Sequence, residues 1–261
     1  MKEIILEILH YRDLLFMLTL RDIRIRYKQA AMGFLWAIFM PMIAVAAGII
    51  IKKAMSLVSG TSMNLESVLS ILVKVLPWTF FISTLRFSVQ SLVGNMDLVT
   101  KIYFPRAVLP LSSLLACLFD FLVASVVLIL FFIIIHTGVS FSMLWVPLIL
   151  FFLILFTAGI GLLLSASNLF YRDIKYVVEA ILTFGIFFTP VFYDASTFGA
   201  WRPLLLANPV GSLLEAFNSA IVLHQNPDLF WLVYAGTASV VMFVLGLVIF
   251  HKNEPLFAEN I

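Results

Sequence analysis

Residues 94–110, GNMDLVTKIYFPRAVLP, form a short polar segment between two long apolar runs. The segment predicts a helical turn at 96–102 that ends before Pro105, because proline cannot continue a helix and restricts the residue before it. We expect a folded connector of this kind to be a binding surface for a partner outside the chain. The side chains that we expect at this contact are Asp97, Lys101, Tyr103, Phe104, Pro105 and Arg106.

The composition on either side of this segment is that of a membrane protein. The 261-residue chain is 63% apolar and 11% charged, whereas soluble domains are roughly 45–50% apolar and 25% charged. A chain of this size cannot bury such an excess, so lipid is its solvent. A net charge of +2 does not indicate nucleic acid, and the single Cys117 forms no disulfide within the chain.

Six apolar runs are expected to span the membrane, because about 20 helical residues at about 1.5 Å each cross a hydrocarbon core of about 30 Å. Residues 195–228 are amphipathic instead, and Asn208-Pro209 predicts the N-cap and first residue of a short helix there. The expected spans are residues 32–51, 68–93, 108–135, 144–169, 176–193 and 229–250.

The first 28 residues predict an amphipathic helix in the membrane interface, separate from one transmembrane domain at 29–261. Its basic cluster has two readings that the sequence leaves open, a topology signal or a specific contact. The apolar stripe is Ile4, Ile8, Tyr11, Leu15 and Leu18, and the cluster is Arg21, Arg24, Arg26 and Lys28.

Basic residues orient the chain. With six spans, eleven Lys and Arg residues in the N-terminal segment, the polar segments at 94–110 and 168–175 and the tail share one side, against Lys52, Lys53 and Arg202 on the other. The positive-inside rule therefore predicts that both termini and both polar segments are cytoplasmic.

Four charges fall inside the expected spans, where charge is costly. Lys74 is expected to snorkel to the outer interface, and Glu179 to reach cytoplasmic water. Arg86 and Asp120 lie at similar depth on consecutive antiparallel helices, which predicts a structural ion pair between them.

Aromatic residues suggest a path for a glycan, since sugar rings stack on aromatic faces, although ordinary packing explains the same spacing. The chain has neither the G-x-x-x-x-G-K-[ST] phosphate loop nor the G-x-S-x-G elbow, so we expect no catalytic residue and no metal site. The candidate path aromatics are Trp36, Phe39, Trp78, Phe81, Phe184 and Phe188.

Five separated stretches together resemble one family, the membrane subunit of ABC polysaccharide exporters, which export lipid-linked O-antigen, capsule or teichoic acid. The stretches are residues 21–42, 97–122, 168–182, 188–194 (FTPVFYD) and 208–217 (NPVGSLLEAF). The resemblance implies an all-α, type-2 ABC exporter fold with six transmembrane helices, an N-terminal interfacial helix and re-entrant helices before the last span. It also implies a homodimer in the bacterial inner membrane.

The same resemblance implies two separate ATPase subunits that bind ATP and Mg²⁺, while this chain binds no cofactor. Residues 94–106 would contain the helix that docks on the ATPase, with Arg172 and Asp173 as a second contact. Arg24, Arg26, Tyr27 and Lys28 would lie at the substrate entrance, where basic charge suits the diphosphate of a polyprenyl-linked glycan. The alternatives are a small-molecule exporter of the same fold and a membrane glycosyl- or acyltransferase.

Overall fold

The computed structural model describes residues 6–7, 9–28, 33–59, 64–136 and 138–257. Ile4 and Ile8 of the expected stripe, and the expected span start at Met32, lie outside the described residues. The described elements are helical. The α-helices are α2 (Arg12–Tyr27), α3 (Trp36–Ser59), α4 (Leu65–Ser91), α5 (Met96–Lys101), α6 (Val108–Ile135), α7 (Val146–Phe170), α8 (Ile174–Phe188), α9 (Arg202–Leu206), α10 (Pro209–Ile221) and α11 (Leu229–Asn253).

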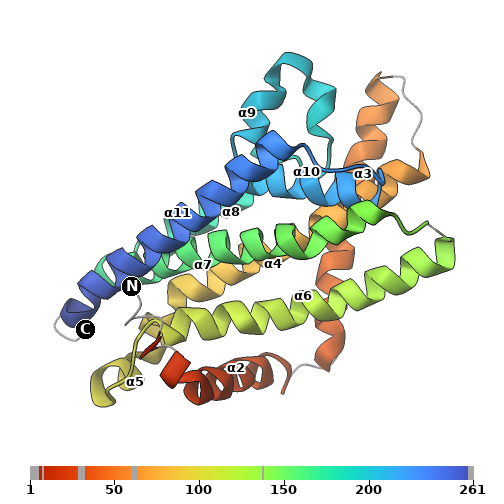
Figure 1. Ribbon diagram of the computed structural model, residues 1–261. Helices are drawn as coiled ribbons and strands as arrows, with labels where there is room; N and C mark the ends of the chain where they lie inside the picture. Colours follow the sequence, from red (N-terminus) through yellow and green to blue (C-terminus); the bar gives the residue numbers. More distant parts are fainter. Residues whose placement is uncertain (1–5, 8, 29–32, 60–63, 137, 258–261) are drawn as a thin grey trace.

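The long helices α4, α6, α7 and α11 run between two ends of a bundle, and α3 crosses them at an angle (Figure 1). One end, which we call the proximal end, carries α5 and the last turns of α11; the opposite, distal end carries α9 and α10. Five stretches of described helix are long and apolar enough to cross a membrane. These are Trp36–Ala54, Leu65–Ser91, Val108–Ile135, Phe141–Phe170 and Leu229–Phe257.

The fifth expected span, residues 176–193, is shorter in the structure than the sequence suggested. Helix α8 has 15 residues and ends at Phe188, which gives a length of only about 22 Å. Thr189 already has an extended backbone, with φ −115° and ψ 133°, because the ring of Pro190 disfavours a helical conformation in the residue before it. The expectation of a continuous helix to residue 193 was therefore wrong.

The segment between α8 and α11 is broken into short helices. The 3₁₀ helix η4 (Ala195–Trp201) and α9 precede α10. The Asn208 side chain accepts a hydrogen bond from the Val210 N–H at 3.1 Å, and Pro209 is the first residue of α10. The predicted N-cap and helix start are confirmed.

Two apolar cores hold the bundle together. The larger core surrounds α4 and includes buried side chains of α7, α10 and α11. The smaller core lies at the proximal end and joins α2, α5, α6, α7 and α11; Phe250 and Phe257 stack edge to face within it at 5.1 Å. Helix α2 contributes Leu18 to this core, while Phe16 and Met17 remain exposed on its other side, as suits a helix between protein and lipid.

Helices α7 and α11 touch backbone to backbone. A Cβ atom added at Gly246 would lie 2.4 Å from the Gly159 carbonyl oxygen, and one at Gly159 would lie 2.4 Å from the Met242 carbonyl oxygen. Small residues permit this approach between membrane helices, so the two helices form one tightly joined pair.

Candidate functional site

The first candidate site is the proximal segment at residues 94–106, which we call the coupling segment. Helix α5 spans Met96–Lys101, and Ile102 is extended, so the predicted helical turn is confirmed. Asp97 and Lys101 form an exposed ion pair at 2.7 Å across one helical turn. Tyr103 is 87% exposed. These three side chains are available to a partner.

The last part of the coupling segment faces inward. Phe104 and Pro105 are buried, and Phe104 belongs to the smaller core. The backbone N–H of Arg106 donates to Glu254 Oε1 at 2.7 Å, and its guanidinium donates to the Glu254 backbone oxygen and to the Val99 oxygen. Phe104, Pro105 and Arg106 fasten the coupling segment to the rest of the chain, and their contact with a partner stays a prediction. Sequence reasoning missed Glu254, which lies 148 residues from Arg106.

A hollow of about 580 Å³ lies beside α5. Its walls come from the coupling segment and from the last turn of α11 and the 3₁₀ helix η5 (Glu254–Phe257) that follows it. The polar side chains in its lining are Glu7, Thr100, Lys101, Tyr103, Arg106, His251 and Glu254.

The second expected contact, Arg172 and Asp173, lies exposed in the turn between α7 and α8. Asn168, which is buried, braces this turn. Its Nδ2 donates to the Val89 oxygen of α4 at 2.9 Å, and its Oδ1 accepts from the Lys175 N–H at 3.2 Å. The turn is therefore anchored to α4 while its charged side chains remain accessible.

The expected substrate entrance divides into fixed and exposed residues. Arg26 donates to Asp120 Oδ2 at 2.7 Å and Tyr27 donates to Asp120 Oδ1 at 2.6 Å. Burial, and then the bond to Asp120, raise the pKa of the Tyr27 phenol. Arg24 and Lys28 remain exposed. Arg26 and Tyr27 thus pin α2 to α6, and Arg24 and Lys28 present charge at the surface.

The expected pair between Arg86 and Asp120 was wrong. Arg86 instead binds Glu179 of α8 through two contacts of 2.6 and 3.0 Å, while Asp120 binds Arg26 and Tyr27 of α2. Residue counting along two helices fixes depth, but it does not fix the direction in which each side chain points. Glu179 is accordingly paired as well as exposed.

The candidate path aromatics also divide. Trp78 and Phe81 are 4% and 7% exposed and belong to the larger core, so their expected place on the path was wrong. Phe39, Phe184 and Phe188 are exposed, and Trp36 is partly exposed. The aromatic face that remains open is on α3 and α8.

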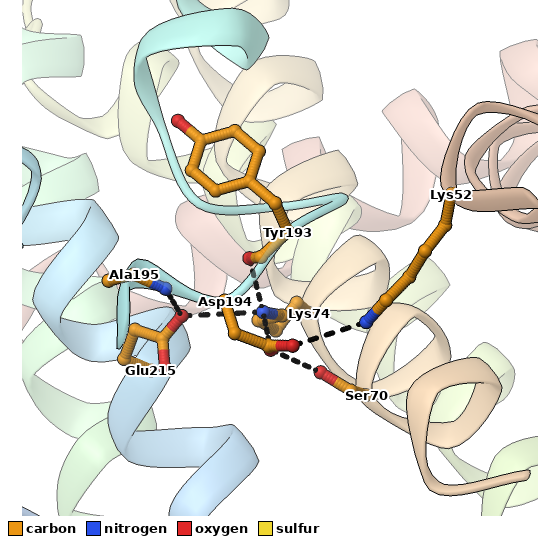
Figure 2. Close-up of polar contacts among 7 residues, drawn as sticks. All are labelled: Lys52, Ser70, Lys74, Tyr193, Asp194, Ala195 and Glu215. Carbon is orange, nitrogen blue, oxygen red and sulfur yellow. Dashed lines mark hydrogen bonds and ion pairs between the residues drawn. The ribbon is translucent and has the colours of Figure 1, made fainter. Parts of the chain in front are cut away.

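A cluster of four charges at the distal end was not predicted (Figure 2). This distal cluster consists of Lys52 of α3, Lys74 of α4, Glu215 of α10, and Asp194, which directly precedes η4. Lys74, which is 0% exposed, donates to the Tyr193 backbone oxygen at 2.7 Å, to Asp194 at 2.8 Å and to Glu215 at 3.3 Å. The expectation that Lys74 snorkels to the interface was wrong, because these acceptors meet it inside the bundle.

Asp194 is the shared carboxylate of the distal cluster. It also accepts from Lys52 at 3.1 Å and from Ser70 at 3.0 Å, while Glu215 accepts from the Ala195 N–H at 3.0 Å. Burial alone would raise the pKa of Asp194, but Lys74 and Lys52 outweigh it and hold that pKa below its usual range. The cluster therefore keeps its charges matched.

The family model described as "ABC-2 type transporter" matches residues 13–222 of the chain. The chain belongs to the ABC-2 type transporter family. With five helices able to cross a membrane among the described residues, this ABC-2 chain is a multi-pass membrane protein of a transporter family.

Curated relatives of this ABC-2 chain include the O-antigen export system permease protein RfbA of two bacteria. The Klebsiella pneumoniae protein is 28% identical over 95% of this chain and 94% of its own length. The Myxococcus xanthus protein is 27% identical over the full length of both chains. The ABC-2 chain is similar to these permeases from end to end.

Proposed function

We propose that this ABC-2 chain is the permease subunit of an ATP-driven exporter that moves a lipid-linked, O-antigen-like polysaccharide across the cytoplasmic membrane of a bacterium. The observation that carries the proposal is the end-to-end similarity to permeases named for O-antigen export. The substrate class follows from those names and from the open aromatic face of α8.

The proposed complex contains two copies of this chain and two ATPase subunits, and the ATPase subunits bind ATP and Mg²⁺. The coupling segment is the proposed docking element for the ATPase, together with Arg172 and Asp173. Its exposed charges are suited to recognition of the ATPase, and its buried end is suited to passing a movement of the ATPase on to the membrane helices. The contacts of Arg106 with Glu254 tie it to the end of α11, and the glycine contact ties α11 to α7. A push on α5 would therefore reach two membrane helices at once.

The exposed face of α8 is the proposed wall of the export path. Phe184 and Phe188 offer aromatic surface to sugar rings. Arg86 and Glu179, with side chains 43% and 54% exposed, offer charged hydrogen-bonding groups to sugar hydroxyls. Half-exposed charges are costly against lipid, so this pair favours a water-filled side for the face.

The exposed basic residues Arg24 and Lys28 are proposed to meet the diphosphate at the cytoplasmic leaflet. Arg26 and Tyr27 would hold them in place through Asp120. This arrangement needs both termini in the cytoplasm, as the distribution of basic residues predicts.

Reconstitution with the cognate ATPase tests the proposal. We expect polyprenyl-diphosphate-linked glycans to stimulate ATP hydrolysis and to be moved across the membrane. The lipid carrier without its glycan should stimulate hydrolysis less and should be transported less. Stimulation by small amphiphiles and not by glycan lipids would identify a small-molecule exporter instead. Failure of any ATPase subunit to associate would favour a membrane transferase.

A further inference from the structure

An apolar groove of about 490 Å³ lies between α7 and α11. One wall comes from Leu148 and Phe152 of α7 and from Trp145, the last residue of the 3₁₀ helix η3 (Phe141–Trp145). The other wall is a stripe of α11 residues between Leu229 and Val241. Several side chains of this stripe are exposed at the surface of the bundle. In a membrane, that surface faces lipid.

The groove presents hydrocarbon to whatever enters it. The hydroxyl of Thr237 donates to the Tyr234 backbone oxygen at 2.8 Å, so it needs no partner from the groove. A Cβ atom at Gly236 would lie 2.8 Å from the ring of Phe152, so this ring packs on the α11 backbone and forms the floor. Water in such a groove would lack hydrogen-bond partners, and an empty groove would lose dispersion contacts. A hydrocarbon chain is the content that suits it.

The groove has the length and the depth of one acyl chain. It follows α11 from Leu229, the first residue of that helix, to Val241, which is a rise of about 18 Å. Half of a hydrocarbon core of about 30 Å is about 15 Å. Helix α11 begins at the distal end of the bundle (Figure 1). The groove therefore runs from the distal membrane surface to about the middle of the bilayer.

Two opposite charges stand at the distal mouth of the groove. Asp228 directly precedes Leu229 and caps α11 by accepting from the Phe230 N–H at 3.2 Å. Arg202 of α9 contacts Asp228 at 3.3 Å, and both side chains are 46% exposed, so each keeps surface for a further partner. The phosphate and the ammonium of a zwitterionic headgroup complement Arg202 and Asp228. A headgroup with a phosphate and no ammonium would bring its negative charge to the Asp228 carboxylate, which disfavours it.

We propose that this groove is a binding site for a zwitterionic phospholipid with a primary amine, of which phosphatidylethanolamine is the probe. One acyl chain lies in the groove, the phosphate contacts Arg202, and the ammonium contacts Asp228. The lipid comes from the leaflet at the distal end and fills the outer side of the joint between α7 and α11. The site requires only that these two helices span a membrane, so it does not depend on the exported substrate.

Photocrosslinking in nanodiscs that hold the full complex tests the headgroup. A phosphatidylethanolamine with a diazirine in one acyl chain should label α11 between Leu229 and Val241, and unlabelled phosphatidylethanolamine should compete better than phosphatidylglycerol. Asp228→Asn keeps an oxygen for the helix cap and removes the charge. We expect it to lower this preference about two- to fivefold, as the loss of one exposed charge contact allows. Arg202→Gln should weaken competition by both lipids, and Lys53→Gln, at an exposed lysine of α3, should change neither.

A matched pair of substitutions on α11 tests the groove itself. Val240 lines the groove and is 46% exposed, whereas Val248, outside its lining, is 44% exposed. Val240→Phe places a ring in the groove and should lower the yield of labelled α11, while Val248→Phe adds the same ring elsewhere on the helix and should leave the yield unchanged. Val241→Phe, at a second lining residue, replaces Val240→Phe if that variant fails to assemble.

Four results would overturn the proposed lipid site. Equal competition by phosphatidylethanolamine and phosphatidylglycerol in the parent complex would remove the headgroup contacts. Equal labelling of Val240→Phe and Val248→Phe would reduce the groove to ordinary lipid contact. Stronger competition by a polyprenyl phosphate would assign the groove to the carrier lipid. Linkage of two Val240→Cys chains by a short bis-maleimide would assign it to a second copy of the chain.

Discussion

The coupling segment and the distal cluster use charge in opposite ways. At the proximal end, the side chains of Asp97 and Lys101 are 88% and 72% exposed, and an exposed pair of this kind stabilises a fold by about 0–1 kcal/mol. At the distal end Lys74 has left water entirely, and removing one partner of a buried pair costs about 3–5 kcal/mol. Charge on the surface is available for recognition, whereas charge in the interior specifies a shape.

The largest expected effect is on the buried half of the distal cluster. Lys74→Met leaves Asp194 and Glu215 without their main partner, and we expect a loss of about 3–5 kcal/mol in the free energy of unfolding. Thermal melting of the complex in nanodiscs measures this loss. Ser70→Ala, which removes one hydroxyl bond to Asp194, is the milder control. Melting of Lys74→Met that matches Ser70→Ala would contradict a structural role for the buried lysine.

The next effect concerns the link between α5 and α11. Glu254→Ala removes the carboxylate that accepts from the Arg106 N–H, which should cost about 1–3 kcal/mol locally and loosen the coupling segment. We expect more ATP hydrolysed per glycan exported, measured in proteoliposomes. Lys252→Gln, which changes an exposed residue in the same stretch, should leave the ratio of ATP hydrolysed to glycan exported unchanged. An unchanged ratio in Glu254→Ala would show that Glu254 has no part in coupling.

A smaller effect is expected at the exposed pair of α5. Lys101→Ala should change the free energy of unfolding by at most about 0.5 kcal/mol, the value of an i,i+4 helix pair. Its effect on affinity for the ATPase should exceed its effect on stability, which binding of the purified ATPase to nanodiscs measures. A lowered melting midpoint together with an unchanged affinity for the ATPase would show that this pair stabilises the fold and does not serve recognition.

The smallest effect is the response of the distal cluster to pH. The pKa of Asp194 is held below its unfolded value, which is about 3.9. Its contribution to stability is therefore fully present above pH of about 4 and is lost as the pH falls through the lower folded value. We expect Asp194→Asn to shift the melting midpoint equally at pH 5 and pH 8. A shift that shrinks between pH 8 and pH 5 would contradict the lowered pKa.

Local signals in the sequence predicted the features that depend on neighbours in the chain. The limits of α6, the turn at α5 and the cap at Asn208 follow from apolar length, proline and side-chain chemistry within a few residues. The early end of α8 was also signalled, by Pro190, although apolar composition extended the expected helix past it.

The pairing of charges could not be predicted in the same way. Arg86 and Asp120 were placed at a common depth, but their actual partners, Glu179 and Arg26, depend on which way each helix faces. Lys74 meets Asp194 and Glu215 from 120 and 141 residues away. Each charge alone suggests a route to water, and only the folded arrangement supplies a partner inside.

The backbone contact between Gly159 and Gly246 also provides a reference frame for experiments. Two helices whose backbones meet at glycines cannot slide or separate without losing this close contact, so we expect α7 and α11 to keep a constant spacing through the transport cycle. The distance between one spin label on α7 and one on α11 should be the same with and without nucleotide. Displacements of other helices, such as α3, can then be measured relative to the α7–α11 pair.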